Sequence, residues 1–314
     1  MHRVMLGKSG ISISRLAFGT LTVSPLQKGF SVDKASALMM AAYNAGINLF
    51  DTAQLYQTYQ PLRILLKRYP DAIIATKSYA HDRKGAQEAF NEARRELDKD
   101  VIDIFMLHEQ ESQLTLKGHR EAFDFYLSMK SKGNIRAVGM STHCVNAAAY
   151  ATRYGGIDVL HPLLNVSGLG IRGGTRDEMF SAVRMAHQAG IGIITMKPLA
   201  GGHLYRDPEK AYAYLNTSEA VDAVAVGMQS EAEISMNVAL FSGNTPDKNM
   251  AKACHASEKR LIVQDWCDGC GKCVERCHQG ALAIINGKAV PNHERCVLCG
   301  YCAADCREFC IKVV

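Results

Sequence analysis

The chain has 314 residues, of which 47% are hydrophobic and 21% are charged, which is enough apolar material for one large core or two smaller ones. This composition excludes a disordered chain and a disulfide-stapled miniprotein. The formal net charge of +5 is too small to indicate nucleic-acid binding. No apolar stretch approaches the roughly 20 residues of a membrane span, and the first residues, MHRVMLGKSG, lack the apolar core of a secretory signal. We therefore expect a cytoplasmic protein without nucleic-acid or membrane partners.

Eight short apolar runs rich in β-branched residues predict strands. They are Leu16 to Gly19, Ile47 to Phe50, Ile73 to Thr76, Ile102 to Leu107, Ala137 to Met140, Val159 to Leu160, Ile193 to Met196 and Ala223 to Val226. Apolar residues at helical spacing lie between them, as in the segment from Leu38 to Ala45 that Gly46 closes. A doubly wound open sheet would give the same alternation, but the number of strands and the length of this part favour an α/β fold of the (β/α)8 TIM-barrel type.

A barrel of this type builds its active site from residues at the carboxyl ends of its strands. Asp51 follows the second predicted strand, and Tyr56 lies in the loop after it, within DTAQLY. Lys77 ends the third strand and His108 the fourth. Each residue alone has an ordinary structural interpretation, as a helix cap, a packed aromatic, a surface charge or a core histidine. Together they place four ionisable side chains on one rim.

These four side chains form a coherent acid–base set. A tyrosine has an unperturbed pKa of about 10, and a neighbouring ammonium favours the phenolate and lowers that pKa. We therefore expect Lys77 to lower the pKa of Tyr56, Asp51 to hold Lys77, and His108 to orient a substrate oxygen. Such a site suits proton delivery to a carbonyl oxygen while hydride arrives at the carbonyl carbon.

Residues 1 to about 240 resemble the aldo-keto reductase superfamily. The segments VMLGKSGISISRLAFGT, GINLFDTAQLY, IIATKS and EARRELDKDVIDIFMLHE are similar to its motifs and occur in the same order. The resemblance implies a catalytic tetrad of Asp51, Tyr56, Lys77 and His108, with Tyr56 as the general acid. The implied reaction interconverts a small-molecule carbonyl and an alcohol.

The resemblance also implies a nicotinamide cofactor, NAD(H) or NADP(H), at the barrel mouth. It places Thr20, Ser141 and the loop Lys197-Pro198-Leu199-Ala200-Gly201 along this cofactor. Three positions depart from the family pattern, because Thr142 stands for the usual Asn, His161 for a carboxamide-binding Gln, and Met196 for a stacking aromatic.

The segment GMQSEAEISMN departs further from the family pattern. Gly227 and Glu233 stand where the family commonly has a Lys and an Arg for the 2′-phosphate of NADP. A carboxylate would repel that phosphate, so we expect NAD to be preferred or the site to serve another purpose. The contacts expected from this segment are Gln229, Ser230 and Asn237.

The eleven cysteines divide the chain by composition. Only Cys144 and Cys254 precede a dense tail that runs from Cys267 to Cys310. We expect a barrel over residues 1–240, a connector over 241–261 that contains turn signals and a helical stretch, and a small α+β domain over 262–314.

The tail repeats one spacing, Cys-x2-Cys-x2-Cys-x3-Cys. Such a run gives three thiolates to one [4Fe–4S] cluster and the fourth to the other. The first predicted cluster takes Cys267, Cys270, Cys273 and Cys306. The second takes Cys296, Cys299, Cys302 and Cys277. Zinc sites normally use paired Cys-x-x-Cys units, and disulfides are disfavoured in a reducing compartment. The tail resembles the bacterial two-cluster ferredoxin, with His278 and Arg307 in place of the usual prolines.

The two parts together suggest an oxidoreductase whose clusters exchange electrons with a ferredoxin or other electron-transfer protein. We expect the source to be an anaerobe. A nicotinamide moves two electrons as hydride whereas a cluster moves one, so a flavin at the barrel mouth is also left open. The alternative is an electron-transfer protein whose barrel is a docking scaffold or holds another redox cofactor. A third hypothesis is a barrel with purely structural clusters.

Overall fold

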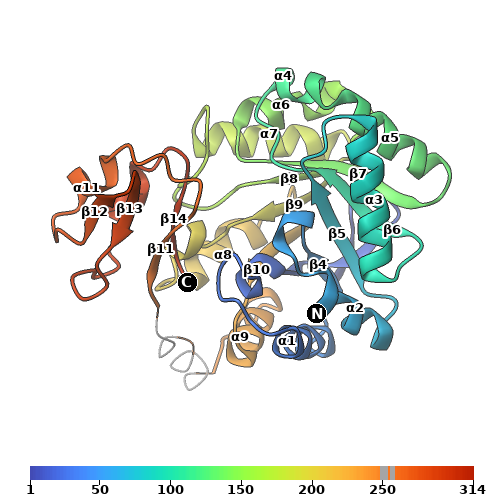
Figure 1. Cartoon of the computed structure of the whole chain (residues 1–314). Helices are drawn as coiled ribbons and strands as arrows, with labels where there is room; N and C mark the ends of the chain where they lie inside the picture. The colour runs from blue at the N-terminus through green and yellow to red at the C-terminus, as the bar shows by residue number, and fades with distance from the viewer. Residues whose placement is uncertain (248–253, 255–258) are drawn as a thin grey trace.

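The computed structural model describes residues 1–247, 254 and 259–314. Eight parallel strands form a closed barrel that is completed where β10 pairs with β3. The strands are β3 (Leu16–Gly19), β4 (Leu49–Asp51), β5 (Ile73–Ser78), β6 (Ile102–Leu107), β7 (Ile135–Thr142), β8 (Val159–Pro162), β9 (Gly192–Met196) and β10 (Ala223–Gly227). Each predicted run contains one of these strands or overlaps it, so the prediction of a (β/α)8 barrel is confirmed (Figure 1).

Helices surround the barrel. They are α1 (Val32–Asn44), α2 (Tyr59–Arg68), α3 (Arg83–Leu97), α4 (Gln113–Gly118), α5 (Arg120–Ser131), α6 (Val145–Tyr154), α7 (Arg176–Gln188), α8 (Pro208–Asn216) and α9 (Glu231–Phe241). Several begin at side chains that accept an unpaired backbone N–H: Asp82 accepts from Gly85, and Thr175 forms a reciprocal capping box with Glu178. Short 3-10 turns η1 (Thr20–Val23), η2 (Gln54–Tyr56) and η3 (Ala200–Gly202) follow strand ends.

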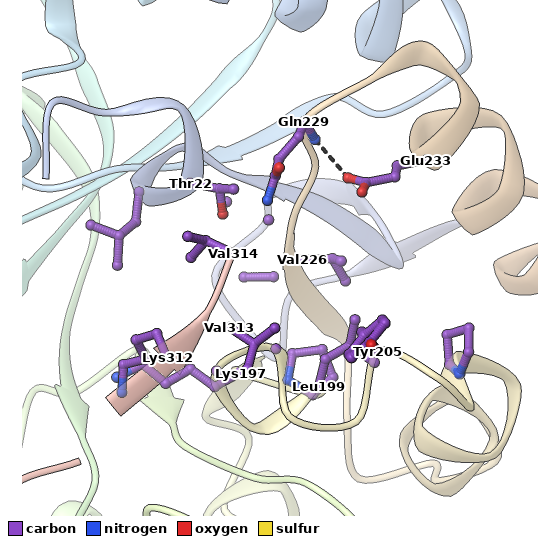
Figure 2. Close-up of a pocket in the computed structure, with 18 of the residues that line it drawn as sticks. Thr22, Lys197, Leu199, Tyr205, Val226, Gln229, Glu233, Lys312, Val313 and Val314 are labelled. Atoms are coloured by element: carbon purple, nitrogen blue, oxygen red, sulfur yellow. Dashed lines mark hydrogen bonds between the residues drawn. The ribbon is translucent and has the colours of Figure 1, made fainter. Parts of the chain in front are cut away.

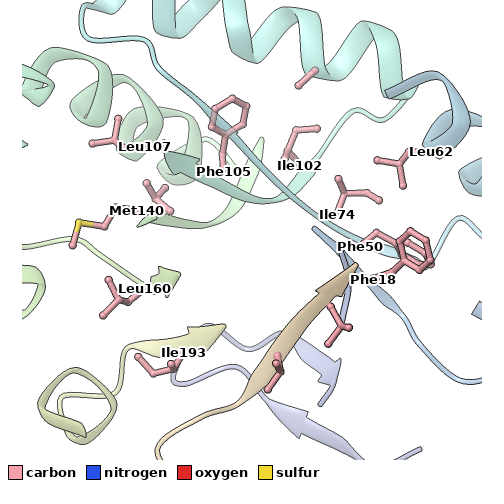
Figure 3. Packing of buried hydrophobic residues seen from close by; sticks show 14 of the residues in the cluster. Phe18, Phe50, Leu62, Ile74, Ile102, Phe105, Leu107, Met140, Leu160 and Ile193 are labelled. Atoms are coloured by element: carbon pink, nitrogen blue, oxygen red, sulfur yellow. The ribbon is translucent and has the colours of Figure 1, made fainter. Parts of the chain in front are cut away.

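The hydrophobic core of the barrel domain has two layers. The outer layer lies between strands and helices, where Phe18, Phe50 and Phe105 are fully buried (Figure 3). The inner layer fills the barrel itself with small and branched side chains. The hairpin of β1 (Arg3–Met5) and β2 (Ser12–Ser14) adds Leu6 and Ile13 to this inner layer. The barrel is therefore a packed core, and a ligand is restricted to its mouth.

The cysteine-rich tail forms a small unit with its own core. Its elements are β11 (Leu261–Val263), α11 (Lys272–Arg276), β12 (Leu282–Ile285), β13 (Lys288–Pro291), α12 (Tyr301–Ala304) and β14 (Ile311–Val313). β11 pairs with β14, and β12 pairs with β13, both antiparallel. The helices α11 and α12 lie at matching places in the two cysteine runs, each preceded by a glycine at φ +80°. The local structure therefore repeats as the spacing does.

The strand β14 carries the carboxyl end of the chain to the barrel mouth (Figure 1). There it meets η3, where Gly202 has φ +92° and lies so close to the Val313 carbonyl that a Cβ would overlap it. His203 Nε2 lies 3.0 Å from the Ile311 carbonyl oxygen. Residues 248–253 and 255–258 of the expected connector over 241–261 lie outside the described residues. Among the residues that are described, no helix has the length and apolar character to cross a membrane.

Candidate active site

A cavity of about 180 Å³ lies at the carboxyl ends of the barrel strands. Its walls come from the loops after β3, β4, β9 and β10, and from β14 and the residue that follows it. Figure 2 shows Lys197 and Lys312 on one side of this cavity and Gln229 and Glu233 on the other. Asp51 and Tyr56 also contribute to its lining. The cavity therefore occupies the place that the barrel fold gives to active sites.

The four predicted catalytic residues converge beside this cavity. Lys77 Nζ donates to Asp51 Oδ1 at 2.7 Å and to the Thr52 carbonyl at 2.6 Å, and it lies 5.0 Å from the centre of the Tyr56 ring. The Tyr56 and His108 rings meet edge to face at 5.8 Å. Three threonine hydroxyls fix the loop that carries Tyr56, since Thr58 Oγ1 bonds both Thr52 Oγ1 and Thr20 Oγ1.

Burial and charge act against each other in the ion pair of Asp51 and Lys77. Burial would raise the pKa of Asp51, but the charges of Lys77 and His161 lower it well below its usual range. Burial lowers the pKa of Lys77, and the Asp51 carboxylate opposes this. The two groups therefore support each other as a carboxylate and an ammonium.

The pKa of Tyr56 differs from our expectation. Burial, and then the negative charge of Asp51, raises it well above the ordinary value of a phenol. The expected lowering by Lys77 fails because the Lys77 ammonium is directed to Asp51 and Thr52. The Tyr56 hydroxyl has no hydrogen-bond partner within the described part of the chain, so it is a protonated donor that faces an open cavity.

His108 is a neutral imidazole. Burial lowers its pKa well below the ordinary value, and the Lys77 charge adds to this effect. Its ring stacks on Tyr79 with the ring centres 4.3 Å apart. Its buried Nδ1 has no hydrogen-bond partner among the described residues. The ring is thus held in place by packing and keeps hydrogen-bonding capacity for a ligand.

The predicted cofactor contacts divide into two groups. Those that line the cavity are Lys197, Leu199, Gly201, Gln229 and Asn237. Those that do not are Thr20, Ser141, His161 and Ser230, and their contact with a cofactor stays a prediction. Each is used inside the protein: Ser141 Oγ accepts from the Glu109 N–H, and Ser230 caps α9 by accepting from Glu233. The Thr20 hydroxyl bonds Thr58.

His161 points to the tetrad and not to the cavity. Its Nδ1 bonds the Ile194 carbonyl, and its Nε2 lies 3.4 Å from Asp51 Oδ1. The two other family departures have separate roles. Thr142 Oγ1 accepts from the Cys144 N–H at the start of α6, and Met196 lines the cavity. The site therefore keeps its acid–base centre but rearranges the groups around it.

Glu233 is paired, which the sequence did not indicate. Its Oε1 lies 3.0 Å from Lys259 Nζ, and its Oε2 accepts from the Gln229 N–H at 2.7 Å. Because the pair is neutral, the repulsion of a 2′-phosphate that we expected from Glu233 is reduced.

A chain of polar contacts next to the tetrad was missed by sequence reasoning. Tyr79 Oη donates to Glu109 Oε2 at 2.7 Å, and His143 Nδ1 lies 2.7 Å from Glu109 Oε1. Lys197 Nζ lies 2.8 Å from His143 Nε2. Since an ammonium can only donate, His143 accepts at Nε2 and donates from Nδ1 to the carboxylate. Burial, followed by the Lys197 charge, lowers the pKa of His143 to about 4, which agrees with this neutral tautomer.

The structure groups the cysteines of the tail around two cavities. One, of about 200 Å³, is lined by Cys267, Cys270, Cys273 and Cys306, together with Cys310. The other, of about 20 Å³, is lined by Cys277, Cys296, Cys299 and Cys302. These are the two sets that the spacing predicts. Backbone N–H groups of Ala289, Ala281 and Cys310 point at sulfurs of Cys267, Cys277 and Cys306, respectively, at 3.2 to 3.5 Å.

In the parts of the chain that the structure describes, no three His, Cys, Asp or Glu side chains converge on one ion position. Burial, and then the neighbouring thiols, raises the pKa of Cys302 to about 12. A cationic group between these thiols would offset their mutual repulsion.

Comparisons with known proteins agree with this fold. A model of the Aldo/keto reductase family matches residues 15–211. The chain is 26% identical over 294 residues to the 6-dehydroglucose reductase of Novosphingobium aromaticivorans, which covers 83% of this chain and 92% of that protein. It is 26% identical over 189 residues to the NADH-specific methylglyoxal reductase of Escherichia coli, which covers 51% and 58% of the two chains.

A solved structure has the same fold. The holo form of an aldo-keto reductase from Bacillus halodurans superposes with a TM-score of 0.66 and 21% identity, and the superposition covers 81% of this chain and 95% of that one. The family match spans more than half of this sequence and includes β3 to β9, with Asp51, Tyr56, Lys77 and His108. The chain therefore belongs to the aldo/keto reductase family of oxidoreductases.

Proposed function

We propose that this protein interconverts a small-molecule carbonyl and an alcohol with a nicotinamide cofactor, and that Tyr56 is the proton donor. The observation that carries the proposal is the unpartnered Tyr56 hydroxyl. It faces the barrel-mouth cavity and is flanked by His108 and the Asp51–Lys77 ion pair. A hydroxyl in this place can form a hydrogen bond to a substrate oxygen and give up its proton to it.

The tetrad residues have separate parts in this chemistry. Tyr56 donates the proton from Oη to the carbonyl oxygen, and its raised pKa keeps that proton bound until a substrate arrives. His108 is neutral, so it orients the same oxygen without competing as an acid. Lys77 provides positive charge near the phenolate that forms, and Asp51 holds Lys77. The cofactor, when bound, supplies or accepts the hydride.

The cavity has features that fit a dinucleotide. Asn237 Oδ1 is buried and has no hydrogen-bond partner among the described residues. Lys197, Leu199, Gly201 and Gln229 would hold the cofactor with it. The similar E. coli protein is named as NADH-specific, and we retain NAD as the favoured cofactor although Lys259 balances the Glu233 charge.

We also propose two [4Fe–4S] clusters in the tail. Cys267, Cys270, Cys273 and Cys306 would hold one cluster. Cys277, Cys296, Cys299 and Cys302 would hold the other. The grouping around two cavities and the N–H groups aimed at sulfur support the proposal. Bound clusters would supply one-electron transfer, for which a ferredoxin is the expected partner. Because thiolate ligation requires a reducing environment, we retain the expectation of a cytoplasmic protein in an anaerobe.

A Tyr56→Phe variant tests the proposed reaction. We expect the turnover of aldehyde probes such as 4-nitrobenzaldehyde to fall at least about a hundredfold, while the dissociation constant for NADH and the iron content stay the same. Tyr150→Phe is the control, because Tyr150 bonds Gln113 on the surface, away from the cavity. Unchanged turnover in Tyr56→Phe would remove the proposed mechanism.

A second candidate function is electron transfer with the barrel as a docking scaffold or as the holder of another redox cofactor, such as a flavin. The observation that favours it is that Thr20, Ser141 and His161 bond within the protein and do not reach the cavity. An anaerobic absorbance titration separates the two functions. Binding of NADH or NADPH supports the reductase. Cluster bleaching by reduced ferredoxin without nucleotide binding supports the carrier, and an acid extract identifies any flavin.

A further inference from the structure

Lys312 is a barrel-mouth residue that comes from the cysteine-rich domain. It lies on β14, its side chain is buried with 4% exposed, and it lines the same cavity as Tyr56. Figure 2 shows it next to Lys197 on one side of that cavity. Its ammonium donates to the Phe309 carbonyl and lies over the Phe309 ring at 3.0 Å from the ring centre. A second domain therefore places a buried cation in the pocket of the first.

The buried charges around the cavity do not balance. Lys77 is paired with Asp51. The Lys197 ammonium reaches the Glu109 carboxylate through His143. Within the described ranges, no carboxylate forms an ion pair with Lys312. Its bonds to a carbonyl and to an aromatic face compensate a buried cation only in part, so burial, followed by the Lys197 charge, lowers the pKa of Lys312 well below its ordinary value. An anion in the cavity would favour the charged form.

We propose that Lys312, with Lys197 beside it, binds an oxyanion carried by the ligand of this cavity. The group is a carboxylate or a phosphate, because these anions accept hydrogen bonds from an ammonium. A carboxylate would belong to the carbonyl substrate, and a phosphate would belong to the dinucleotide. This inference rests on the proposed function for the identity of the ligand, but not for the existence of the subsite.

The cysteine-rich domain offers a competing partner for Lys312. The thiols of Cys306 and Cys310 lie near enough to oppose the lowering of the Lys312 pKa, which burial and then the Lys197 charge cause. However, Lys312 lines the barrel cavity and does not line the cavity of the Cys306 set. The geometry therefore favours the ligand of the barrel, and the experiment includes the cluster as an explicit alternative.

The test measures binding of two unreactive anions to the cluster-loaded full chain by calorimetry without oxygen. ADP-ribose carries the phosphates of a dinucleotide, and succinate carries carboxylates on a small carbon chain. The variants are Lys312→Met, which removes the charge, and Lys312→Arg, which keeps it. Lys288→Met is the control, because Lys288 is exposed on β13 in the same domain and does not line the cavity. Thermal unfolding and iron content confirm that each variant folds.

We expect Lys312→Met to weaken binding of at least one anion about tenfold, while Lys312→Arg and Lys288→Met stay near wild type. Weaker binding of ADP-ribose by Lys312→Met assigns the subsite to the cofactor phosphate. Weaker binding of succinate assigns it to a substrate carboxylate. Equal binding by wild type and Lys312→Met, or no binding of either anion by wild type, overturns the proposal. A shifted cluster potential with unchanged binding overturns it as well and assigns Lys312 to the cluster.

The result does not depend on turnover, because neither probe reacts. A protein whose Tyr56→Phe variant keeps its carbonyl turnover can still show anion binding that requires Lys312. Conversely, an active reductase can bind both anions without using Lys312. Failure of the proposed function and failure of the subsite are thus separate outcomes.

Discussion

At the scale of single residues, the site depends on a buried ion pair. Asp51 and Lys77 are 6% and 1% exposed, and both belong to strands whose residues are all buried. The desolvation cost of two buried charges can equal their attraction, so such a pair contributes more to positioning than to stability. In this protein it holds positive charge 5.0 Å from the Tyr56 ring centre. Removing one partner should therefore lower the free energy of unfolding by more than the intact ion pair contributes to it.

A Lys77→Met variant makes this cost measurable. It leaves the Asp51 carboxylate buried with only His161 nearby, and we expect the free energy of unfolding to fall by about 3–5 kcal/mol. The double variant Asp51→Asn, Lys77→Met should recover part of this loss, because no charge then remains unpaired. Lys67→Met on the exposed face of α2 is the control, with a change within about 0.5 kcal/mol. Denaturant unfolding gives the values, and a double variant less stable than Lys77→Met would contradict this account.

The buried neutral His143 makes stability depend on pH. Its pKa is about 4 in the folded protein, against about 6.5 for an unfolded histidine. Between these values the unfolded chain binds a proton that the folded chain does not, so stability falls as the pH decreases through this window. We expect wild type to lose about 2 kcal/mol more than His143→Gln between pH 7 and pH 5. Urea unfolding at the two pH values measures the difference, and parallel losses would show that His143 does not contribute.

At the scale of elements, the contact of β14 with η3 joins the two parts of the chain. Gly202 provides it in two ways: its φ of +92° is strained for other residues, and the missing Cβ leaves room for the Val313 carbonyl. Backbone geometry alone would restrict a substitution here. The close approach adds a second restriction that a glycine with open space at its Cβ position, such as Gly133, does not have.

Gly202→Ala and Gly133→Ala separate these two restrictions. Gly133 has φ +78°, and nothing lies within 4 Å of the position that its Cβ would take. We expect the alanine at Gly133 to cost about 1 kcal/mol for backbone strain. At Gly202 the cost should be larger, with faster amide hydrogen exchange in Ile311–Val313 because the strand must move. If both variants lost the same free energy of unfolding and amide hydrogen exchange in β14 stayed unchanged, Gly202 and the Val313 carbonyl would not be in tight contact.

The sequence predicted elements better than it predicted contacts between them. The barrel strands were predictable because each is a short β-branched run. Asp51 and Tyr56 were predictable because they lie at the end of β4 and in the loop after it. The orientation of His161 was not predictable, since it depends on the Ile194 carbonyl of the neighbouring strand and on Asp51. The pairing of Glu233 with Lys259 and the position of Lys312 depend on how the tail docks on the barrel. No local pattern encodes that docking.

At the scale of the whole molecule, the tail is a part of the barrel's site as well as a separate unit. The Cys306 thiol accepts from the Cys310 N–H, and the chain between them carries Phe309, whose ring lies 5.1 Å from Lys197 Nζ. Lys312 follows directly after this turn and reaches the barrel cavity. No cysteine of either predicted set lines that cavity, but Cys306 begins the turn that leads to Lys312, whereas Cys277 does not belong to this turn. The Cys306 set is therefore joined to the barrel cavity through residues 307–312.

This difference leads to a prediction for two matched variants, Cys306→Ser and Cys277→Ser. Each removes the fourth thiolate of one proposed cluster, so each should lose about half of the bound iron. Only Cys306→Ser should also weaken ADP-ribose binding to the barrel, because its loss frees the turn that positions Phe309 and Lys312. Cys144→Ser is the control, since Cys144 lies on the barrel at the start of α6 and should retain all the iron. Iron analysis measures the loss of iron, and calorimetry measures ADP-ribose binding. If Cys277→Ser weakened ADP-ribose binding as much as Cys306→Ser, the two cysteine sets would affect the barrel cavity equally and the prediction would be wrong.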